Sequence, residues 1–385
     1  MAHNSDAARD PLELQTEAAA VYLGIMAVAI LNVLPALSGV LLSVLGWNER
    51  EIGHFASADF AGGLLGTLLT TVLRRRSSFR DIGTIGMGLL ALADLYSCTT
   101  VSPDLLIGAR FIGGIGSGLA IAVAFLVFAR SRPERGIAFW SIGQLIFGLI
   151  AITVIPHAAI KFGWQSMFLA LGILAVPGVA LSQYLPRVAV PDAPEPRISS
   201  APTRMNVWMW LAVIGVGVFY SGQGGVWPYL DVIGIKSGIS QSSVEMSVSL
   251  AAASALAGSL VIVAVGRRFG RAVPLLISFL ITVASLLTVR STNPWVFRVA
   301  LSMFTFSWPI FAAYQFGAIA VHDRSGQVGA YVTTANFAGF MLGSLLAAEV
   351  SAGQGFRGVV WLALALDTFA VVLLVPLLFR GTRNG

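Results

Sequence analysis

The chain is dominated by long apolar runs separated by short polar connections. Twelve of these runs are long enough to cross about 30 Å of hydrocarbon as a helix, which takes about 20 residues. Strict alternation of apolar and polar positions is absent from the runs, so helices are favoured over the strands of a barrel. The predicted spans are 18–46, 52–73, 79–101, 104–128, 136–159, 165–185, 206–230, 242–265, 272–289, 294–320, 327–350 and 356–379.

Composition supports an all-α integral membrane protein. Hydrophobic residues make up 56% of the 385 residues and charged residues only 11%, whereas soluble domains carry about 25% charged residues. The segment 1–16 is polar and acidic and lacks the basic start and small-residue cleavage site of a signal peptide, so we expect it to stay cytoplasmic and disordered. Cys98 is the one cysteine and no metal-ligand cluster is evident, so the sequence predicts no metal and no cofactor.

The distribution of Lys and Arg predicts the orientation. Of 24 such residues, 17 fall in the termini and connections on one side of the predicted spans and 5 on the other, while Arg110 and Arg298 lie in or near spans. Cytoplasmic loops carry the excess of positive charge. Both termini are therefore expected in the cytoplasm, in a multi-pass protein of a bacterial cytoplasmic (inner) membrane.

A connection rich in Pro, Ala and Ser divides the spans six and six. The expected organisation is a cytoplasmic N-terminus (1–16), a six-helix bundle (17–185), a cytoplasmic linker (186–205), a second six-helix bundle (206–380) and a cytoplasmic tail (381–385). The segment AGGLL at 61–65 resembles AGSLV at 257–261, at an offset of 196 residues. A duplicated six-span unit explains this similarity.

A glycine-rich stretch, RFIGGIGSG, runs from Arg110 to Gly118 inside the fourth apolar run. A dinucleotide-binding loop would follow a soluble strand and have an acidic partner downstream, and neither condition is met. We therefore interpret Gly114, Gly116 and Gly118 as surfaces for close helix packing.

These features together resemble the major facilitator superfamily. Arg110 with Gly114, Gly116 and Gly118 is similar to its fourth-span pattern Arg-x-x-x-Gly-x-Gly-x-Gly. The family's cytoplasmic loop motif is degenerate after the second span and better preserved after the eighth, and the acidic residues of both copies are missing. The positions that match the loop motif are Gly66, Arg74, Arg75, Arg268, Gly270 and Arg271. The resemblance implies two pseudo-symmetric bundles that rock about a midplane cavity lined mainly by spans 1, 4, 7 and 10.

Ionisable residues within spans are costly unless paired or hydrated, and so are candidates for proton coupling. Asp59 lies on the same helical face as Gly62, Gly63 and Gly66, which favours packing against protein. The hypothesis is that Asp59 is protonatable and coupled to Arg110, and the alternative is a static structural pair. Asp94 and Asp367 are weaker candidates.

Interrupted helices are typical of transporter sites. Gly224, Gly225 and Pro228 weaken the seventh span, and Asn32 with Pro35 is expected to weaken the first. The alternative is that Gly and Pro are simply tolerated in membrane helices.

Aromatic and amide side chains on candidate lining spans favour an aromatic or amphipathic solute over a sugar, unless they are ordinary packing. Arg298 was placed near the pseudo-symmetric position of Arg110, where the two guanidinium groups would suit a carboxylate, although Arg298 at the membrane interface explains it equally. The candidate substrate-binding residues are Asn32, Arg110, Trp140, Gln144, Tyr220, Gln223, Trp227, Arg298, Trp308, Tyr314 and Gln315.

The sequence thus predicts a secondary transporter, not an enzyme, for proton-coupled uptake of a small organic acid or an aromatic or amphipathic solute. The alternative is a proton-coupled exporter of hydrophobic compounds, although 141–156 lacks the Gly-Pro pair that drug antiporters of the family usually carry. A membrane enzyme or a sensor is disfavoured because no nucleophile, metal site, carboxylate dyad or soluble output domain is evident. The expected partners are the solute, protons and lipids, without nucleic acid, and the chain is expected to be monomeric.

Overall fold

A computed structural model describes residues 11–130, 133–187, 207–266, 268–322 and 328–380, and the regular structure of these residues is helical throughout. Nine of the described helical stretches are long and apolar enough to cross a membrane. The last of them, Tyr331–Leu378, is 48 residues long and contains two predicted spans. Two other predicted spans form helices that are too short, or carry too many charged residues, to be counted among these nine. Twelve spans therefore remain a prediction.

The first half of the chain begins its helical structure earlier than expected. Residues 11–16 were predicted to be disordered but belong to the first helix, while 1–10 lie outside the described residues. The helices of this half are α1 Pro11–Ala27, α2 Ala29–Leu45, α3 Glu49–Leu73, α4 Phe79–Ser97, α5 Pro103–Arg130, α6 Pro133–Phe162 and α7 Gln165–Leu181, followed by the 3₁₀ turn η1 Ser182–Tyr184.

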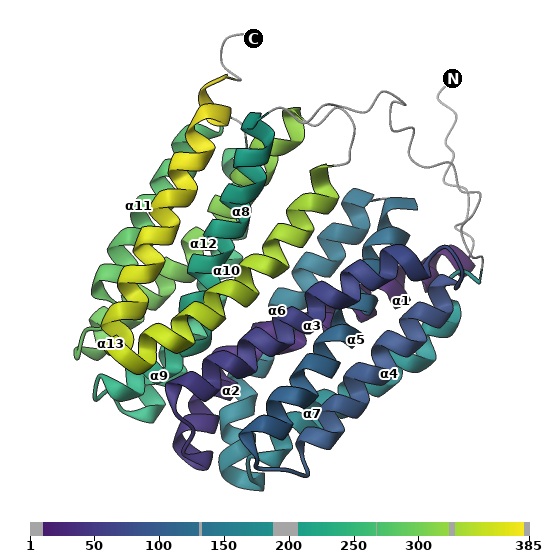
Figure 1. Cartoon of the computed structure of the whole chain (residues 1–385), viewed down its shortest axis with the longest axis horizontal. Coiled ribbons are helices and arrows are strands. Elements are labelled where there is room, and N and C mark those ends of the chain that lie inside the picture. Colours follow the sequence, from purple (N-terminus) through teal and green to yellow (C-terminus); the bar gives the residue numbers. More distant parts are fainter. Residues whose placement is uncertain (1–10, 131–132, 188–206, 267, 323–327, 381–385) are drawn as a thin grey trace.

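The second half follows the predicted linker, of which only Pro186 and Arg187 are described. Its helices are α8 Val207–Val226, the 3₁₀ turn η2 Trp227–Tyr229, α9 Leu230–Lys236, α10 Gln241–Val265, α11 Ala272–Thr288, α12 Pro294–His322 and α13 Val328–Arg380. Gly355 interrupts α13 with a φ of 61° and a ψ of −164°. There the ribbon turns back on itself, and the yellow and yellow-green stretches of α13 diverge from this turn (Figure 1).

The first predicted span is broken at Val28, whose φ of −108° and ψ of 10° separate α1 from α2. We expected the weak point at Asn32 and Pro35, but α2 continues through both residues. Proline lacks the amide that would bond the carbonyl four residues earlier, here that of Leu31. A donor from elsewhere in the fold satisfies this carbonyl, as described below.

Glycines bring helices into backbone contact. A methyl group built at Gly62 of α3 would lie 2.1 Å from the Phe111 carbonyl oxygen of α5, and one at Gly258 of α10 would lie 2.2 Å from the Phe306 carbonyl oxygen of α12. The two contacts are therefore related by offsets of 196 and 195 residues. This correspondence is the structural counterpart of the repeat seen in the sequence.

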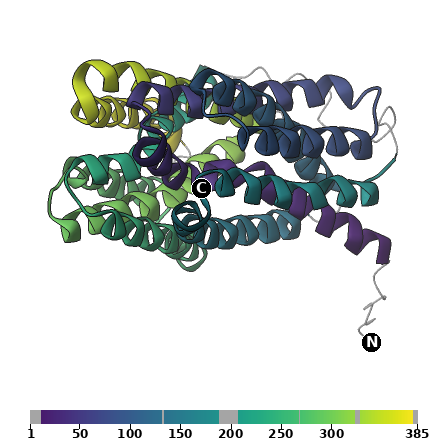
Figure 2. The same cartoon turned by 90° about the horizontal axis from the view of Figure 1, so that it is seen from below.

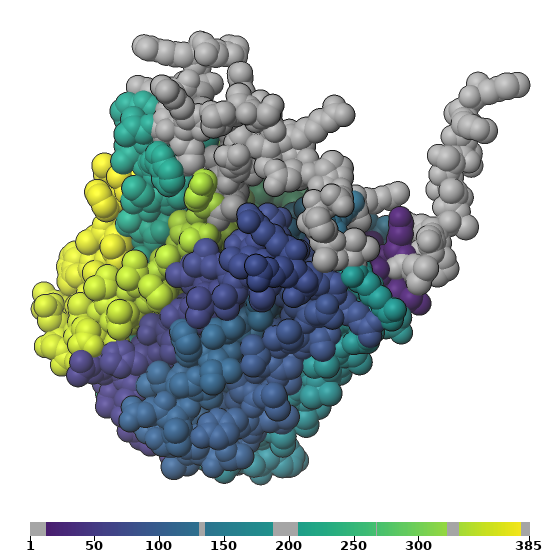
Figure 3. Space-filling view, turned by 45° about the vertical axis from the view of Figure 1, so that its right-hand side comes forward, coloured from purple at the N-terminus to yellow at the C-terminus, as the bar shows by residue number. Residues whose placement is uncertain are grey.

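We call residues 11–187 the N-half and 207–380 the C-half. The halves occupy opposite sides of the molecule in two perpendicular views (Figures 1 and 2). They meet where α3 packs on α13, α2 on α9 and η2, and α6 on α10. A space-filling view shows the yellow-green part of α13 directly against α3 (Figure 3). We call the end that carries residues 46–49 and 349–355 the clasped end, because contacts between the halves concentrate there.

Candidate functional site

An aromatic cluster lies where the halves meet. Tyr220 of α8, Trp308 of α12 and Phe340 of α13 contact one another, with ring centroids 5.1 to 6.5 Å apart. Phe340 also stacks on Phe60 of α3 at 4.7 Å, which links the cluster to the N-half. Tyr220 is buried and Trp308 is partly exposed, so the cluster has an accessible edge. Such a surface can hold an apolar or aromatic group.

Two prolines free backbone carbonyls beside this cluster. The Leu31 carbonyl, left without a helical donor by Pro35, accepts a hydrogen bond of 2.6 Å from Nε1 of Trp227 in the other half. The Gly224 carbonyl, four residues before Pro228, accepts a 2.8 Å bond from Oγ of Ser344. The interruption of the predicted seventh span is thus a 3₁₀ turn at 227–229. The preceding glycines stay helical, and a methyl built at Gly224 would lie 2.7 Å from the Phe340 backbone.

The predicted polar residues of the first and fifth spans lie together. Nδ2 of Asn32 donates to the backbone carbonyl oxygen of Gln144 at 3.2 Å. Trp140 packs edge-on against Phe125 at 5.0 Å, and its buried Nε1 donor has no hydrogen-bond partner in the described residues. The buried indole N–H is therefore an unused hydrogen-bond donor.

The two remaining candidates on α12 differ. The Tyr314 hydroxyl donates to the Gly266 carbonyl oxygen at 2.6 Å, which ties α12 to the end of α10. Gln315 is fully buried, and neither of its amide atoms has a hydrogen-bond partner in the described residues. Tyr314 therefore has a structural partner already, whereas Gln315 has unused polar capacity.

Arg110 pairs with Asp94, not with Asp59. Its guanidinium is fully buried, with Nη1 2.8 Å from Oδ1 of Asp94, Nη2 3.2 Å from Oγ of Ser97, and Cζ 5.5 Å from the Phe168 ring centroid. Asp94, expected near a helix end, is itself buried. The sequence assigned the weaker role to the acid that forms the direct ion pair.

Asp59 is buried, and no hydrogen bond or ion pair reaches its side chain in the described residues. The charges of Arg110 and Asp94 are nevertheless close enough to act on it. A methyl group built at Gly114 of α5 would lie 2.1 Å from the Asp59 backbone carbonyl oxygen, so the backbones of α3 and α5 are in close contact here. Coupling between Asp59 and Arg110 therefore has to act through space or through water.

The predicted pairing of Arg110 with Arg298 in one vestibule does not fit the structure. Phe111 and Phe306 make equivalent contacts in the two halves, so the position equivalent to Arg110 is Thr305. Thr305 comes seven residues after Arg298. Arg298 lies near the start of α12, with Cζ 4.6 Å from the ring centroid of the exposed Trp295. This geometry agrees with the interfacial alternative, since a guanidinium and an indole both favour the membrane–water boundary.

Asp367 of α13 is also buried. Both of its carboxylate oxygens lie 3.4 Å from Nε2 of Gln223, and a methyl group at Gly222 would lie 2.3 Å from Oδ1. The Asp367–Gln223 contact is confined to the C-half and is long for a charge-assisted hydrogen bond.

The predicted loop-motif residues lie at the end of the molecule opposite the clasped end. Arg74 caps the end of α3 and Arg271 caps the start of α11. Nε of Arg271 would lie 3.5 Å from a methyl group at Gly317 of α12. Gly270 has a φ of 69°, a left-handed conformation that favours glycine. At Gly66, Gly116 and Gly118 a methyl group would lie 2.2 to 2.4 Å from a backbone oxygen of a neighbouring helix.

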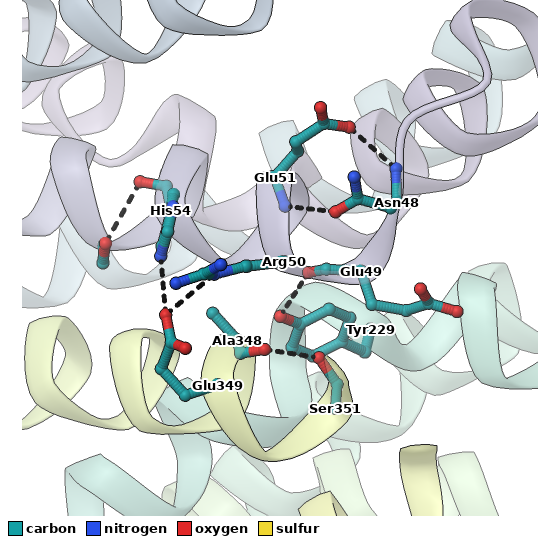
Figure 4. A network of polar contacts seen from close by, with 10 residues as sticks. Asn48, Glu49, Arg50, Glu51, His54, Tyr229, Ala348, Glu349 and Ser351 are labelled. Carbon is teal, nitrogen blue, oxygen red and sulfur yellow. Dashed lines mark hydrogen bonds and ion pairs between the residues drawn. The ribbon is translucent and has the colours of Figure 1, made fainter. Parts of the chain in front are cut away.

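Polar side chains join the halves at the clasped end (Figure 4). Arg50 Nε and His54 Nε2 of α3 lie 3.0 and 3.2 Å from Oε1 of Glu349 on α13. The Tyr229 hydroxyl donates to the Glu49 carbonyl oxygen at 2.8 Å, and the Glu49 carboxylate pairs with Lys236. We call these six residues, Glu49, Arg50, His54, Tyr229, Lys236 and Glu349, the clasp.

Sequence reasoning missed the clasp and one buried acid, Asp231. The seventh span was drawn to end at residue 230, but α9 continues to Lys236, and Asp231 is 1% exposed. The available signal was an acid within the apolar stretch 229–235. The clasp joins residues up to 299 positions apart, so no local pattern could reveal it.

Comparison with known proteins identifies the family. A profile described as Major Facilitator Superfamily matches residues 19–221, more than half of the chain. The chain belongs to this superfamily. It is accordingly a member of a family of membrane transporters.

The individual proteins that this superfamily member resembles share low sequence identity with it. The multidrug resistance protein MdtL of Escherichia coli (strain K12) is 25% identical over 153 residues, which cover 38% of this chain and 39% of that protein. A mutant of the nucleoside transporter NupG superposes with a TM-score of 0.71 at 15% identity, covering 95% of this chain and 98% of that one. A bacterial homologue of the human lysosomal transporter Spinster, solved in an inward-facing and unoccupied conformation, gives 0.66 at 13% identity, with 97% and 98% covered. These structures establish the shared fold.

Proposed function

We propose that the chain is a proton-coupled secondary transporter that takes up small aromatic or amphipathic solutes by alternating access. It would lie in the cytoplasmic membrane with both termini inside, so that the clasped end faces outward. The observation that carries the proposal is the aromatic cluster of Tyr220, Trp308 and Phe340, which reaches across the halves to Phe60. A group bound there touches both halves, and its binding can therefore favour one arrangement over another.

The state of Arg110 argues against a carboxylate as the preferred solute. Its guanidinium is buried and already paired with Asp94 at 2.8 Å. An organic anion would have to displace that acid, which would leave a buried carboxylate without its counter-ion. Trp140 Nε1 and the Gln315 amide offer neutral polar atoms instead. A neutral aromatic solute is better matched to these groups, and a cationic one could bind the ring faces of the aromatic cluster.

Proton coupling is assigned first to Asp59. It is buried without a partner, and the Asp94–Arg110 pair acts on it electrostatically. An isolated carboxylate in such a place is costly when ionised, so a change in hydration would change its proton occupancy. Purified transporter with Asp59→Asn, reconstituted in proteoliposomes, should lose accumulation driven by a pH gradient while retaining solute exchange. Full gradient-driven accumulation would refute the assignment.

The solute class can be tested by binding. Three indoles share one ring system but differ in charge at neutral pH: tryptamine is a cation, tryptophol is neutral and indole-3-acetate is an anion. Thermal stabilisation of the purified protein reports binding without interference from passive permeation. The cation or the neutral compound should stabilise the protein at a lower concentration than the anion. Stabilisation by the anion alone would contradict the proposed class.

Export is the second candidate function, because the similarity to MdtL is to a multidrug resistance protein. The fifth-span sequence weighs against export, since 141–156 contains Gly143 and Gly148 but no Gly-Pro pair. The sign of proton movement separates the two functions. Solute entering a liposome carries protons in with it during symport and drives protons out during antiport, whichever way the protein is inserted.

A further inference from the structure

Asp231 lies on the seam between the halves. It belongs to α9 of the C-half, and α9 packs on α2 of the N-half. Glycine at position 39 of α2 allows this approach, because a methyl group there would lie 2.9 Å from Oδ2 and 3.1 Å from Cβ of Asp231. The carboxyl group therefore rests against the backbone of the other half.

The side chain of Asp231 has no counter-ion in this arrangement. It is 1% exposed, its Oδ1 has no hydrogen-bond partner, and no ion pair reaches it in the described residues. The nearest cation along α9, Lys236, is paired with Glu49. An ionised carboxylate buried without a partner is strongly disfavoured, so contact between the halves favours the protonated acid.

The groups facing Asp231 do not change this conclusion. From α2 it meets Gly39, which has no side chain. From α10, the charged group is Glu245, an acid that cannot serve as a counter-ion. From η2, the Tyr229 hydroxyl is engaged with the Glu49 carbonyl oxygen.

We propose that Asp231 is a proton-binding site whose occupancy is linked to closure of the clasped end. When α2 and α9 separate, water reaches the carboxyl group and the proton can leave. When they meet again, the group must be protonated. By linkage, acid favours the closed seam and alkali favours the open one. Asp59 and Asp367 differ, because each is buried within one half.

The inference rests on the proposed proton coupling, but its test requires no solute and can fail independently. Spin labels are placed at Thr99→Cys and Thr292→Cys in a Cys98→Ser background, where Cys98 is the single native cysteine. Both label positions are exposed, at the clasped end of the N-half and of the C-half. Electron–electron distance measurements in lipid nanodiscs then report opening of this end at each pH.

The ratio of long to short distances should rise about fivefold or more between about pH 5.5 and about pH 8.5 in the parent protein, and change less than about twofold in Asp231→Asn. Asp231→Ala should behave in the same way and serves where the first variant folds poorly. Asp367→Asn, a matched change of a buried acid inside the C-half, should keep the response. So should His54→Gln, which removes the ionisable imidazole of the clasp.

Three results would overturn the inference. The first is an unchanged pH response in Asp231→Asn, and the second is loss of the response in His54→Gln, because in either case the proton would act elsewhere. The third is a parent distance distribution that does not respond to pH.

Discussion

The ion pair between Asp94 and Arg110 gives the sharpest prediction at the scale of residues. Asp94→Asn removes the anion 2.8 Å from a fully buried guanidinium. Breaking a buried pair from one side costs about 3–5 kcal/mol. We expect the unfolding temperature of the detergent-solubilised protein to fall by about 5 °C or more. Thermal unfolding followed by fluorescence measures this change.

Asp59→Asn is the matched control for that experiment. It makes the same chemical change in a buried acid that has no hydrogen-bond or ion-pair partner in the described residues. Its stability should stay equal to the parent or increase, and Asp94→Asn combined with Arg110→Gln should recover part of the loss. Equal destabilisation by both single variants would contradict the assignment of the pair.

Glycine contacts give a second prediction at this scale. Gly114→Ala would place a methyl group 2.1 Å from the Asp59 carbonyl oxygen, so α3 and α5 would have to separate. Overpacking of this kind typically costs about 1–3 kcal/mol. Gly108→Ala on the same helix meets nothing within 4 Å and should be tolerated. Folded yield by size-exclusion chromatography distinguishes them, and equal yields would count against close packing of α3 and α5.

At the scale of elements, the clasp holds α3 against α13. Glu349→Gln removes the anion shared by Arg50 and His54. Each exposed ion pair contributes about 0.2–1 kcal/mol, so loss of both should raise the open population about two- to thirtyfold, and high salt should act in the same direction. The label pair at positions 99 and 292 measures the change. Glu51→Gln on the same helix is the control, because the Glu51 carboxylate bonds its own helix start. A larger effect from Glu51→Gln would argue against the clasp.

The aromatic cluster gives a second prediction for elements. Trp308 contacts Tyr220, Trp227, Phe304 and Phe340, so Trp308→Ala should weaken binding of an aromatic solute about tenfold or more. Trp361 on α13 is 57% exposed, and Trp361→Ala should leave the affinity unchanged. Titration of thermal stabilisation supplies both affinities. Unchanged binding in the Trp308 variant would place the solute elsewhere.

The sequence predicted elements well because long apolar runs are local features. Predicted spans 52–73 and 242–265 correspond to α3 and α10 within a few residues. The break in the first span was placed wrongly because the cost of Pro35 depends on a distant donor. Trp227, 196 positions away, bonds the freed carbonyl and lets the helix continue.

Pairings between distant residues were beyond sequence reasoning for the same reason. The sequence suggested coupling between Asp59 and Arg110, but the direct partner is set by how α4 packs on α5, and that packing brings Asp94 to Arg110. Asp231 was missed because hydropathy sets a span boundary by average polarity. An acid near that boundary can still be buried when the other half of the protein covers it, as the N-half covers Asp231.

At the scale of the whole molecule, two halves are joined at one end by the clasp and by the seam at Asp231, and the aromatic cluster lies between them. Opening of the clasped end would hydrate Asp231 and expose the cluster from that side, while closure would require the proton. The central claim is therefore that solute movement and proton movement are coupled in one chain.

The most direct test is to trap a pH-sensitive dye inside proteoliposomes and add externally the indole that binds most tightly. We expect a solute-dependent acidification of the interior that is absent from protein-free liposomes and reduced in Trp308→Ala. Alkalinisation would select export by antiport. Solute binding with no protein-dependent proton movement of either sign would contradict proton-coupled transport.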